Sequence, residues 1–344
     1  MIQFQCDYNE GAHPLILQRL AETNMEQTVG YGEDPYCEQA RQLIRCACEN
    51  DNVDIHFLVG GTQTNTTVIA HTLRPYQGVI SASTGHINVH ETGAIESTGH
   101  KVLSVESPDG KLTADQIEKT MQAHLQEDGP EHMVQPGMVY LSFPTEVGTT
   151  YTLGELEAIS TICKKYRLYL FVDGARLGYG LCSPGSDITL PQLAHLTDIF
   201  YIGGTKVGAL FGEAVVISNE NLKHDFRYSI KRHGGMLAKG RLLGIQFATL
   251  FTDNLYWQIS QHAIDEAMRI KTALQEADIR FLIDSPTNQQ FPIFSNAQLE
   301  ALGQKYRFSF WQKMDDAHTA VRICTSWGTK SENVDKLIED IRQL

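Results

Sequence analysis

The chain has 344 residues, more than one hydrophobic core comfortably holds, so we expect two domains. Its 20% charged and 42% apolar residues are ordinary values for a globular protein. The net charge of −13 argues against binding to nucleic acid or to an anionic membrane. It does not argue against a phosphorylated cofactor, because local backbone donors decide phosphate binding.

The composition also bears on the compartment. Seven scattered cysteines suit a reducing environment, and Cys46 and Cys48 have the wrong spacing for zinc or for a redox pair. The first residues show no basic stretch followed by an apolar run, so we expect no secretory signal. No stretch approaches the length of a transmembrane helix. We therefore expect a cytoplasmic protein.

The first elements lead to a glycine-rich turn. An extended segment is expected over residues 2–8, followed by one helix from Pro14 to about Met25 and another from about Pro35. His56–Val59 predicts a strand, and a further helix is expected over Thr66–Leu73.

Between that strand and that helix stand Gly60, Gly61 and Thr62. A strand, a glycine pair, a hydroxyl and a helix form the arrangement in which backbone N–H groups and the helix dipole hold a phosphate. The dinucleotide fingerprint and the P-loop are both missing. A plain loop is the alternative, and we favour phosphate binding at Gly61 and Thr62.

His86 and His90 follow the next expected strand, Val79–Ala82. A spacing of four would place both histidines on one helix face, which invites a metal site. No third ligand stands at a suitable spacing, and the order typical of zinc peptidases is missing. We therefore expect no metal, and we interpret His90 as a partly buried helix residue.

The middle of the chain continues the alternation of strands and helices. We expect strands over Lys101–Val105 and Val139–Ser142. A helix is expected over Thr113 to about Glu127, with a Thr-x-x-Gln capping pattern at its start. The loop Gly129–Gly137 carries His132.

Two expected apolar strands farther along the chain each end near a residue that could take part in catalysis, one a carboxylate and the other an amine. Leu168–Val172 leads to Asp173, and Asp198–Ile202 leads through a Gly-Gly-Thr turn to Lys206, 33 residues after Asp173. That interval has room for a helix and a strand, as in a βαβ unit. Parallel strands would place Asp173 and Lys206 at the same carboxyl-terminal edge, where α/β sheets bind ligands.

An aspartate and a lysine across such a crevice suit pyridoxal phosphate. An amine beside closely packed apolar backbone favours its neutral form, as a Schiff-base lysine requires, and the carboxylate would keep the pyridine nitrogen protonated. The hydroxyl of Thr205 could hydrogen-bond the phosphate. Alone, Lys206 is better explained as a surface lysine in a tight turn, and Asp173 could be a helix N-cap. Together, the pair favours the cofactor.

The C-terminal part is expected to form a smaller α/β domain after a long helical region from about Arg241 to Glu276. Alternation points Arg322 to the opposite face from Val321 and Ile323, and an exposed strand arginine is the simplest interpretation. A helix should end the chain. The expected strands are Arg280–Ile283, Gln290–Phe294, Arg307–Trp311 and Ala320–Cys324.

Several short segments together resemble the threonine aldolases, a family of fold-type-I pyridoxal-phosphate enzymes. Each segment is weak alone, but their order and spacing are specific and span most of the chain. The segments are Tyr31–Pro35, Gly61-Thr62, His86 with Glu91–Ala94, Asp173–Arg176, Thr205-Lys206 and Val321-Arg322.

The resemblance implies roles for individual residues. His86 is expected to stack on the cofactor ring and, directly or through water, to take the proton of the substrate hydroxyl. Arg322 is expected to hold the substrate carboxylate in a bidentate pair. Arg176 would assist Arg322 or brace Asp173.

Other positions follow the family less closely. Tyr31 is expected in an active site at a subunit interface, and His132 falls where the family carries a second active-site histidine; an exposed loop histidine is equally open. Cys6 replaces a serine that touches the substrate carboxylate. The turn Phe143–Gly148 replaces Glu-Asn-Thr-His-Asn, and Leu237 replaces an arginine.

The resemblance implies an α/β, fold-type-I transferase-like architecture. We expect residues 1–240 to form a large domain with a mostly parallel, seven-stranded sheet, and residues 241–344 to form a linking helical region and a small C-terminal α/β domain. The expected reaction is aldol cleavage of a β-hydroxy-α-amino acid such as threonine by a homodimer or homotetramer. A β-eliminating lyase or aminotransferase on the same fold, or a non-catalytic cofactor-binding protein, are the alternatives.

Overall fold

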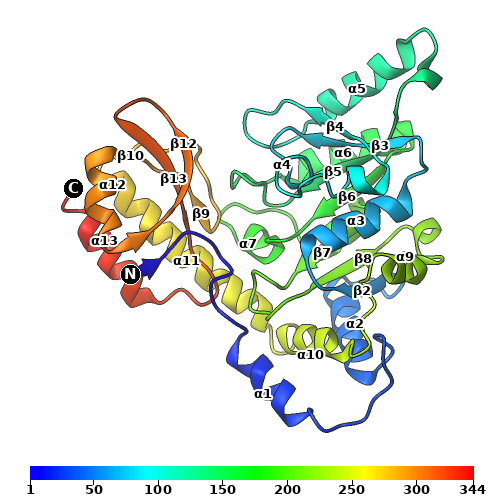
Figure 1. The fold of residues 1–344 in the computed structure, drawn as a ribbon, viewed down its shortest axis with the longest axis horizontal. Helices are drawn as coiled ribbons and strands as arrows, with labels where there is room; N and C mark the ends of the chain where they lie inside the picture. The colour runs from blue at the N-terminus through cyan, green and yellow to red at the C-terminus, as the bar shows by residue number, and fades with distance from the viewer.

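A seven-stranded sheet forms the centre of the larger lobe in the computed structural model, which describes residues 1–344 (Figure 1). Its order is β2-β8-β7-β6-β5-β3-β4, and only β8 runs antiparallel to its neighbours. The prediction of a large, mostly parallel sheet is confirmed. The strands are β2 (Asp54–Leu58), β3 (Gln77–Ala82), β4 (Val102–Val105), β5 (Gln135–Ser142), β6 (Tyr169–Asp173), β7 (Ile199–Gly203) and β8 (Glu213–Ile217).

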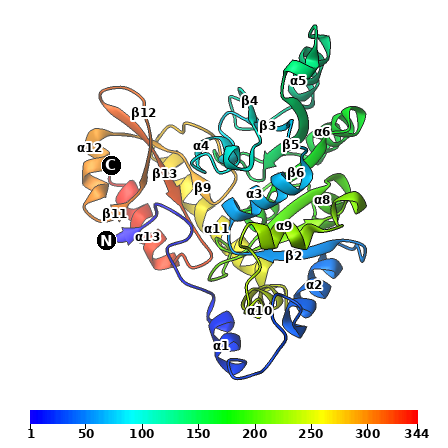
Figure 2. The same ribbon diagram turned by 45° about the vertical axis from the view of Figure 1, so that its right-hand side comes forward.

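Helices surround this sheet and link it to a smaller lobe (Figures 1 and 2). Those of the larger lobe are α1 (Pro14–Glu22), α2 (Pro35–Ala47), α3 (Gly61–Thr72), α4 (His86–Val89), α5 (Ala114–Gln126), α6 (Leu153–Tyr166), α7 (Leu177–Leu181), α8 (Leu190–Leu196), α9 (Phe226–Arg232) and α10 (Arg241–Leu250). Three short 3₁₀ turns are η1 (Glu96–Thr98), η2 (Pro130–His132) and η3 (Glu220–Leu222).

Alternating side chains of the strands build a core on each face of the sheet. Leu170 and Val172 of β6 belong to a cluster of 44 buried residues, whereas Phe171 between them belongs to a second cluster of 18. Successive strand side chains point to opposite faces, so one strand supplies both cores. A sheet buried on both faces explains why these strands are nearly continuous apolar runs.

The strand order reverses between β3 and β5. From β3 the chain moves outward to β4, whereas β5, β6 and β7 follow one another in the other direction. The loops after β3 and β5 therefore lead away from each other, and a crevice opens outside the carboxyl ends of these strands. This crevice is where an open α/β sheet binds its ligand.

The smaller lobe combines both ends of the chain. Its β1 (Ile2–Gln3) pairs in parallel with β11 (Tyr306–Arg307), and Phe4 lies in a third cluster of 13 buried residues. The division of the chain near residue 240 stays a prediction. The other elements of this lobe are β9 (Gln289–Gln290), β10 (Ile293–Ser295), β12 (Ser309–Lys313), β13 (His318–Cys324), α12 (Asn296–Gly303) and α13 (Ser331–Ile341).

Four expected elements differ in the structure. Helix α3 begins at Gly61 rather than Thr66, because the extended residue Gly60 ends the strand segment and its carbonyl accepts the first helical hydrogen bond. The expected helical region 241–276 is two helices, α10 and α11 (Leu255–Glu276), separated where Asp253 and Asn254 adopt left-handed φ angles of 51° and 60°.

The other two differences concern expected strands: Gln290–Phe294 is divided into β9 and β10, and residues 280–283 do not form a strand. Phe281 makes a single bridge to Pro292. A proline has no N–H to donate, so the pairing does not extend into a ladder. No helix of the protein has both the length and the apolar character needed to cross a membrane.

Candidate active site

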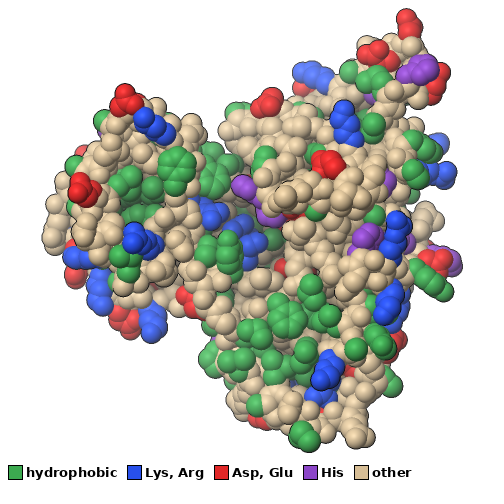
Figure 3. Space-filling view, in the orientation of Figure 1, with side chains coloured by type: hydrophobic (Ala, Val, Ile, Leu, Met, Phe, Trp, Pro, Cys, Tyr) green, Lys and Arg blue, Asp and Glu red, His purple; other side chains and the backbone are tan.

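A cavity of about 320 Å³ opens at the carboxyl edge of the large sheet, where the strand order reverses. The space-filling view shows the hollow between the two lobes, with basic and histidine side chains along it (Figure 3). Its walls combine glycines from the start of α3 with polar side chains from the strand ends. The polar residues that matter most are His86, Glu146, Asp173, Arg176, Lys206 and Glu213.

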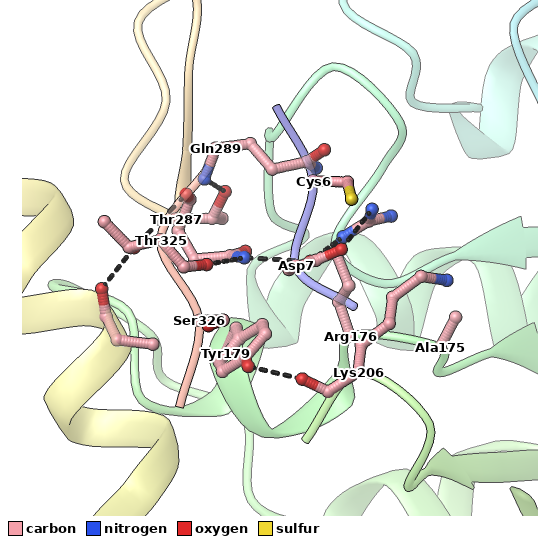
Figure 4. A network of polar contacts seen from close by, with 12 residues as sticks. Cys6, Asp7, Ala175, Arg176, Tyr179, Lys206, Thr287, Gln289, Thr325 and Ser326 are labelled. Carbon is pink, nitrogen blue, oxygen red and sulfur yellow. Dashed lines mark hydrogen bonds and ion pairs between the residues drawn. The ribbon is translucent and has the colours of Figure 1, made fainter. Parts of the chain in front are cut away.

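Lys206 lies in the turn after β7, at the same edge as Asp173. Strands β6 and β7 are parallel neighbours, as the interval between the two residues predicts. The hydroxyl of Tyr179 donates to the backbone carbonyl of Lys206 at 2.6 Å and holds the turn (Figure 4). Burial and the nearby Arg176 lower the pKa of the Lys206 amine. A larger neutral fraction makes this amine a better nucleophile.

Asp173 ends β6 as a buried carboxylate that accepts four hydrogen bonds. Burial alone would raise its pKa, but the charge of His86 and the tyrosine hydrogen bonds hold the pKa below its usual value. The site therefore contains a fixed negative charge. The donors are Tyr140 Oη at 2.5 Å and Asn65 Nδ2 at 3.1 Å to Oδ2, and Tyr201 Oη and the Ala175 N–H to Oδ1.

The N-terminus of α3 faces the same cavity. Gly60, Gly61 and Thr62 line it, and no side chain caps this helix. An added Cβ would meet no atom within 4 Å at Gly60, and it would lie 3.2 Å from Tyr201 Oη at Gly61. Uncapped N–H groups at the positive end of a helix dipole suit a phosphate.

The hydroxyl of Thr205 is already engaged within its own turn. It donates to Glu213 Oε1 at 2.8 Å and accepts from the N–H of Gly212 at 3.0 Å. Glu213 also accepts from the N–H of Gly204 at 3.1 Å. Thr205 and Glu213 therefore brace the turn that carries Lys206, and phosphate binding by Thr205 stays a prediction.

His86 lies between two glutamates on the wall formed by the loops after β3 and β5. Its ring Nδ1 is 2.7 Å from Glu91 Oε1, and its backbone N–H donates to Glu146 Oε1 at 2.8 Å. Burial alone would lower the pKa of His86, but the bond to Glu91 and the charge of Asp173 raise it above its usual value. Burial and Asp173 raise the pKa of Glu146.

Arg176 pairs with the N-terminal segment rather than with Asp173. Its Nε and Nη2 donate to Asp7 Oδ2 and Oδ1 at 2.6 and 3.0 Å, and Asn288 Nδ2 donates to the same carboxylate at 2.9 Å. Figure 4 shows Asp7 between Arg176 and the segment of the smaller lobe that carries Thr287. Arg176 still lines the cavity beside Lys206.

Arg322 approaches from β13 of the smaller lobe. Its guanidinium lies over the ring of Trp311 at 5.6 Å and donates to Gln289 Oε1 at 3.2 Å. The Nε atom is buried and has no hydrogen-bond partner. Cys6, the other residue expected near the substrate carboxylate, donates its thiol hydrogen to Asn9 Oδ1 at 3.1 Å. The Nη2 atom of Arg322 donates to the backbone carbonyl of Gln5 at 3.2 Å, so both terminal nitrogens are engaged, and neither Arg322 nor Cys6 lines the cavity.

Two further expected site residues do not line the cavity. Tyr31 is 48% exposed and lies under Lys231, whose Nζ is 5.2 Å from the ring centroid. His132 precedes β5, whose first residue Gln135 pairs with Gln77 at the start of β3. The amino end of β5 lies roughly 23 Å from its carboxyl end at this strand length. The structure therefore does not bring His132 to the cavity of its own chain.

Sequence reasoning missed several residues that line or support the site. Glu91 belongs to the segment Glu91–Ala94 and Glu146 to the turn Phe143–Gly148, but the sequence pattern gives neither residue a role. Polar residues at buried positions of strands and of α3 indicate others, since burial of a polar group requires a partner. These residues are Asn65 on α3, Tyr140 and Ser142 on β5, Tyr201 on β7 and Glu213 at the start of β8.

Replacement of Glu213 by glutamine should change how stability depends on pH. Burial raises the pKa of Glu213 to about 7, whereas an unfolded glutamate ionises near 4.5. The folded wild type binds the extra proton between these values, so its stability falls as the pH rises from about 4.5 to about 7. The difference in free energy of unfolding between the wild type and Glu213→Gln should therefore shift against the wild type by roughly 3 kcal/mol from pH 5 to pH 8.

Urea unfolding of both proteins at pH 5 and pH 8 measures this difference. Glu157→Gln, at an exposed position of α6, is the matched control and should follow the wild type. Parallel pH profiles for the wild type and Glu213→Gln would show that Glu213 does not retain a proton in the folded protein.

Comparison with known proteins places the chain among enzymes that share this architecture. The family described as beta-eliminating lyase matches residues 5–296. A low specificity L-threonine aldolase of Pseudomonas aeruginosa is 30% identical over 343 residues, covering 99% of this chain and 97% of that protein. A second low specificity L-threonine aldolase, from a Pseudomonas species, is 31% identical over 348 residues with the same coverage.

Solved structures agree with this assignment. A threonine aldolase of Leishmania major has a TM-score of 0.97 at 45% identity, covering 100% of this chain and 99% of that chain. An aspartate aminotransferase of Thermus thermophilus has a TM-score of 0.72 at 13% identity, covering 100% and 91%, and shares the fold alone. The fold-type-I prediction and the resemblance to threonine aldolases are confirmed, and the chain belongs to the beta-eliminating lyase family.

Proposed function

We propose that the protein is a pyridoxal-phosphate-dependent aldolase that cleaves threonine or allo-threonine to glycine and acetaldehyde. The observation that carries this proposal is the pair at adjacent strand ends. Lys206, an amine with a lowered pKa, and Asp173, a buried carboxylate, face one cavity. The threonine aldolases to which the chain is similar support the choice of reaction.

The residues around the cavity fit this cofactor. Lys206 would hold its aldehyde group, the uncapped start of α3 at Gly61 and Thr62 would hold its phosphate, and Asp173 would accept the pyridine N–H. Both Asp173 oxygens already accept two hydrogen bonds, so that N–H would share an oxygen with one of the present donors. When bound, pyridoxal phosphate supplies a ring that draws electrons from the bond to be broken.

The smaller lobe would orient the substrate. Arg322 has a planar guanidinium, which matches the two oxygens of an α-carboxylate, and a bound substrate would replace its contacts with Gln289 and Gln5. Arg176 lines the cavity, and its pair with Asp7 fixes its position. A carboxylate held at one end leaves the Cα–Cβ bond free to stand across the ring plane, which is the geometry cleavage requires.

His86 would handle the proton of the substrate hydroxyl. Its Nδ1 is engaged by Glu91, so Nε2 is the ring nitrogen that remains for the substrate. An imidazole can take and return a proton near neutral pH.

The protein is expected to convert threonine or allo-threonine into equimolar glycine and acetaldehyde. An eliminating lyase or an aminotransferase would produce a keto acid instead, and a non-catalytic protein would produce neither. Chromatography of the amino acids and an aldehyde assay measure the products. Formation of 2-oxobutanoate as the main product would reject the aldolase.

Lys206→Ala is the control for this assay and should abolish the reaction. Borohydride treatment of the wild type loaded with pyridoxal phosphate should attach the label to the peptide that contains Lys206. A label on another lysine, found by peptide mass spectrometry, would reject this assignment.

Arg322→Lys should weaken binding of glycine while the cofactor spectrum stays unchanged. Lysine keeps the charge but loses the planar fork, which should cost about 1–3 kcal/mol of binding free energy. Titration with glycine, followed by the visible absorbance of the cofactor, measures the affinity. Arg307→Lys, at an exposed position of β11, should bind as the wild type does; an equal affinity in Arg322→Lys would place the carboxylate elsewhere.

We also propose that the chain works as a homodimer or larger homo-oligomer in which Tyr31 reaches a neighbouring site. Tyr31 is exposed and outside its own cavity, and Leu15, Leu17, Met25 and Val29 are exposed on the same N-terminal stretch. Figure 3 shows hydrophobic side chains gathered over α1 and α10. Sedimentation at assay concentration should give at least a dimer, and a fully active monomer would contradict this.

A further inference from the structure

Glu91 belongs to the segment Glu91–Ala94, and the proposed reaction gives it no contact with the substrate or the cofactor. It follows α4, and its side chain has no exposed surface. Its Oε1 atom is 2.7 Å from Nδ1 of His86 and also accepts from Asn65 Nδ2 at 2.7 Å. Its Oε2 atom is buried without a partner. A carboxylate so placed is held in one orientation and directs one oxygen at the imidazole.

This contact decides which nitrogen of His86 carries the proton. A carboxylate oxygen only accepts, so in the neutral ring the proton must reside on Nδ1 and the lone pair on Nε2. The backbone N–H of the same residue is fixed by Glu146. The ring therefore has one engaged nitrogen and one available nitrogen, and the side chain remains 35% exposed.

We propose that Glu91 is a positioning residue that fixes His86 as a proton acceptor through Nε2 for the β-hydroxyl of the substrate. This inference rests on the proposed aldol cleavage. The β-hydroxyl O–H bond breaks and its proton passes to Nε2. Its electron pair forms the C=O bond of the aldehyde, the Cα–Cβ pair stays with Cα, and Cα takes up one proton to give glycine.

The charges around His86 favour the imidazolium that this transfer creates. Glu91, Glu146 and Asp173 face it from the loop after α4, the turn after β5 and the end of β6. Lys206 and His90 oppose it from the turn after β7 and from the end of α4. A carboxylate that holds the tautomer and stabilises the imidazolium acts the same way in serine hydrolases, without taking the proton itself.

The first test needs no change in Glu91. Nitrogen-15 NMR of the full chain, with the His86 signals assigned by their loss in His86→Phe, should show the neutral ring protonated at Nδ1. In Glu91→Gln the imidazole should titrate about one pH unit lower or more, because a negative partner has been removed. Glu96→Gln, at an exposed position of η1, is the matched control. A neutral ring protonated at Nε2 would overturn the inference even if Glu91→Gln did not fold.

The second test separates positioning from a general structural role. Glu91→Gln should lower the turnover of threonine about 10²-fold, with glycine affinity unchanged. In a His86→Phe background, the same change should cost no more than about 2-fold, because the group it positions is already gone. An undiminished cost in that background would reject positioning through His86.

The two tests also separate this inference from the proposed reaction. A wild type that forms no acetaldehyde would overturn the reaction and the role at the β-hydroxyl together. An active wild type with the wrong tautomer, or with additive effects of the two substitutions, would overturn the inference alone.

Discussion

A buried carboxylate that must stay ionised determines the layout of this site. Asp173 lies at the end of β6, where burial of an unpaired charge would cost several kcal/mol. Four donors offset that cost, and they come from α3, β5, β7 and its own loop. Because Asn65 also donates to Glu91, the network that holds Asp173 continues to His86. The two sides of the cavity are therefore parts of one hydrogen-bonded structure.

The sequence predicted the Asp173–Lys206 pair because it depends on regular geometry. Two apolar runs separated by the length of a crossover imply parallel strands, and parallel strands align their carboxyl ends. Phosphate binding at the start of α3 is likewise predicted from a local pattern, a strand followed by two glycines, a hydroxyl and a helix. Each prediction needed only local pattern and topology, without any knowledge of how side chains pack.

Contacts between loops could not be predicted in this way. His86 and Glu146 are 60 residues apart, and only the parallel pairing of β3 with β5 places the starts of their loops at the same edge of the sheet. Arg176 is expected from the sequence to assist Arg322 or brace Asp173, but its Nε and Nη2 donate to Asp7, 169 residues earlier. The prediction of His132 as a site residue rests on the family resemblance and not on topology. The residue lies at the amino edge of the sheet.

The contacts of Asp7 also constrain the order of events when the chain is made. Asp7 accepts hydrogen bonds from Arg176 and from Asn288, and Asn288 comes 281 residues after Asp7. The neighbouring strand β1 pairs with residues 306 and 307. Synthesis proceeds from the N-terminus, and domains generally fold as they emerge. The first strand therefore stays unpaired until residues 306 and 307 have left the ribosome. Closure of this long loop makes the wall that carries Arg176 a late product of folding.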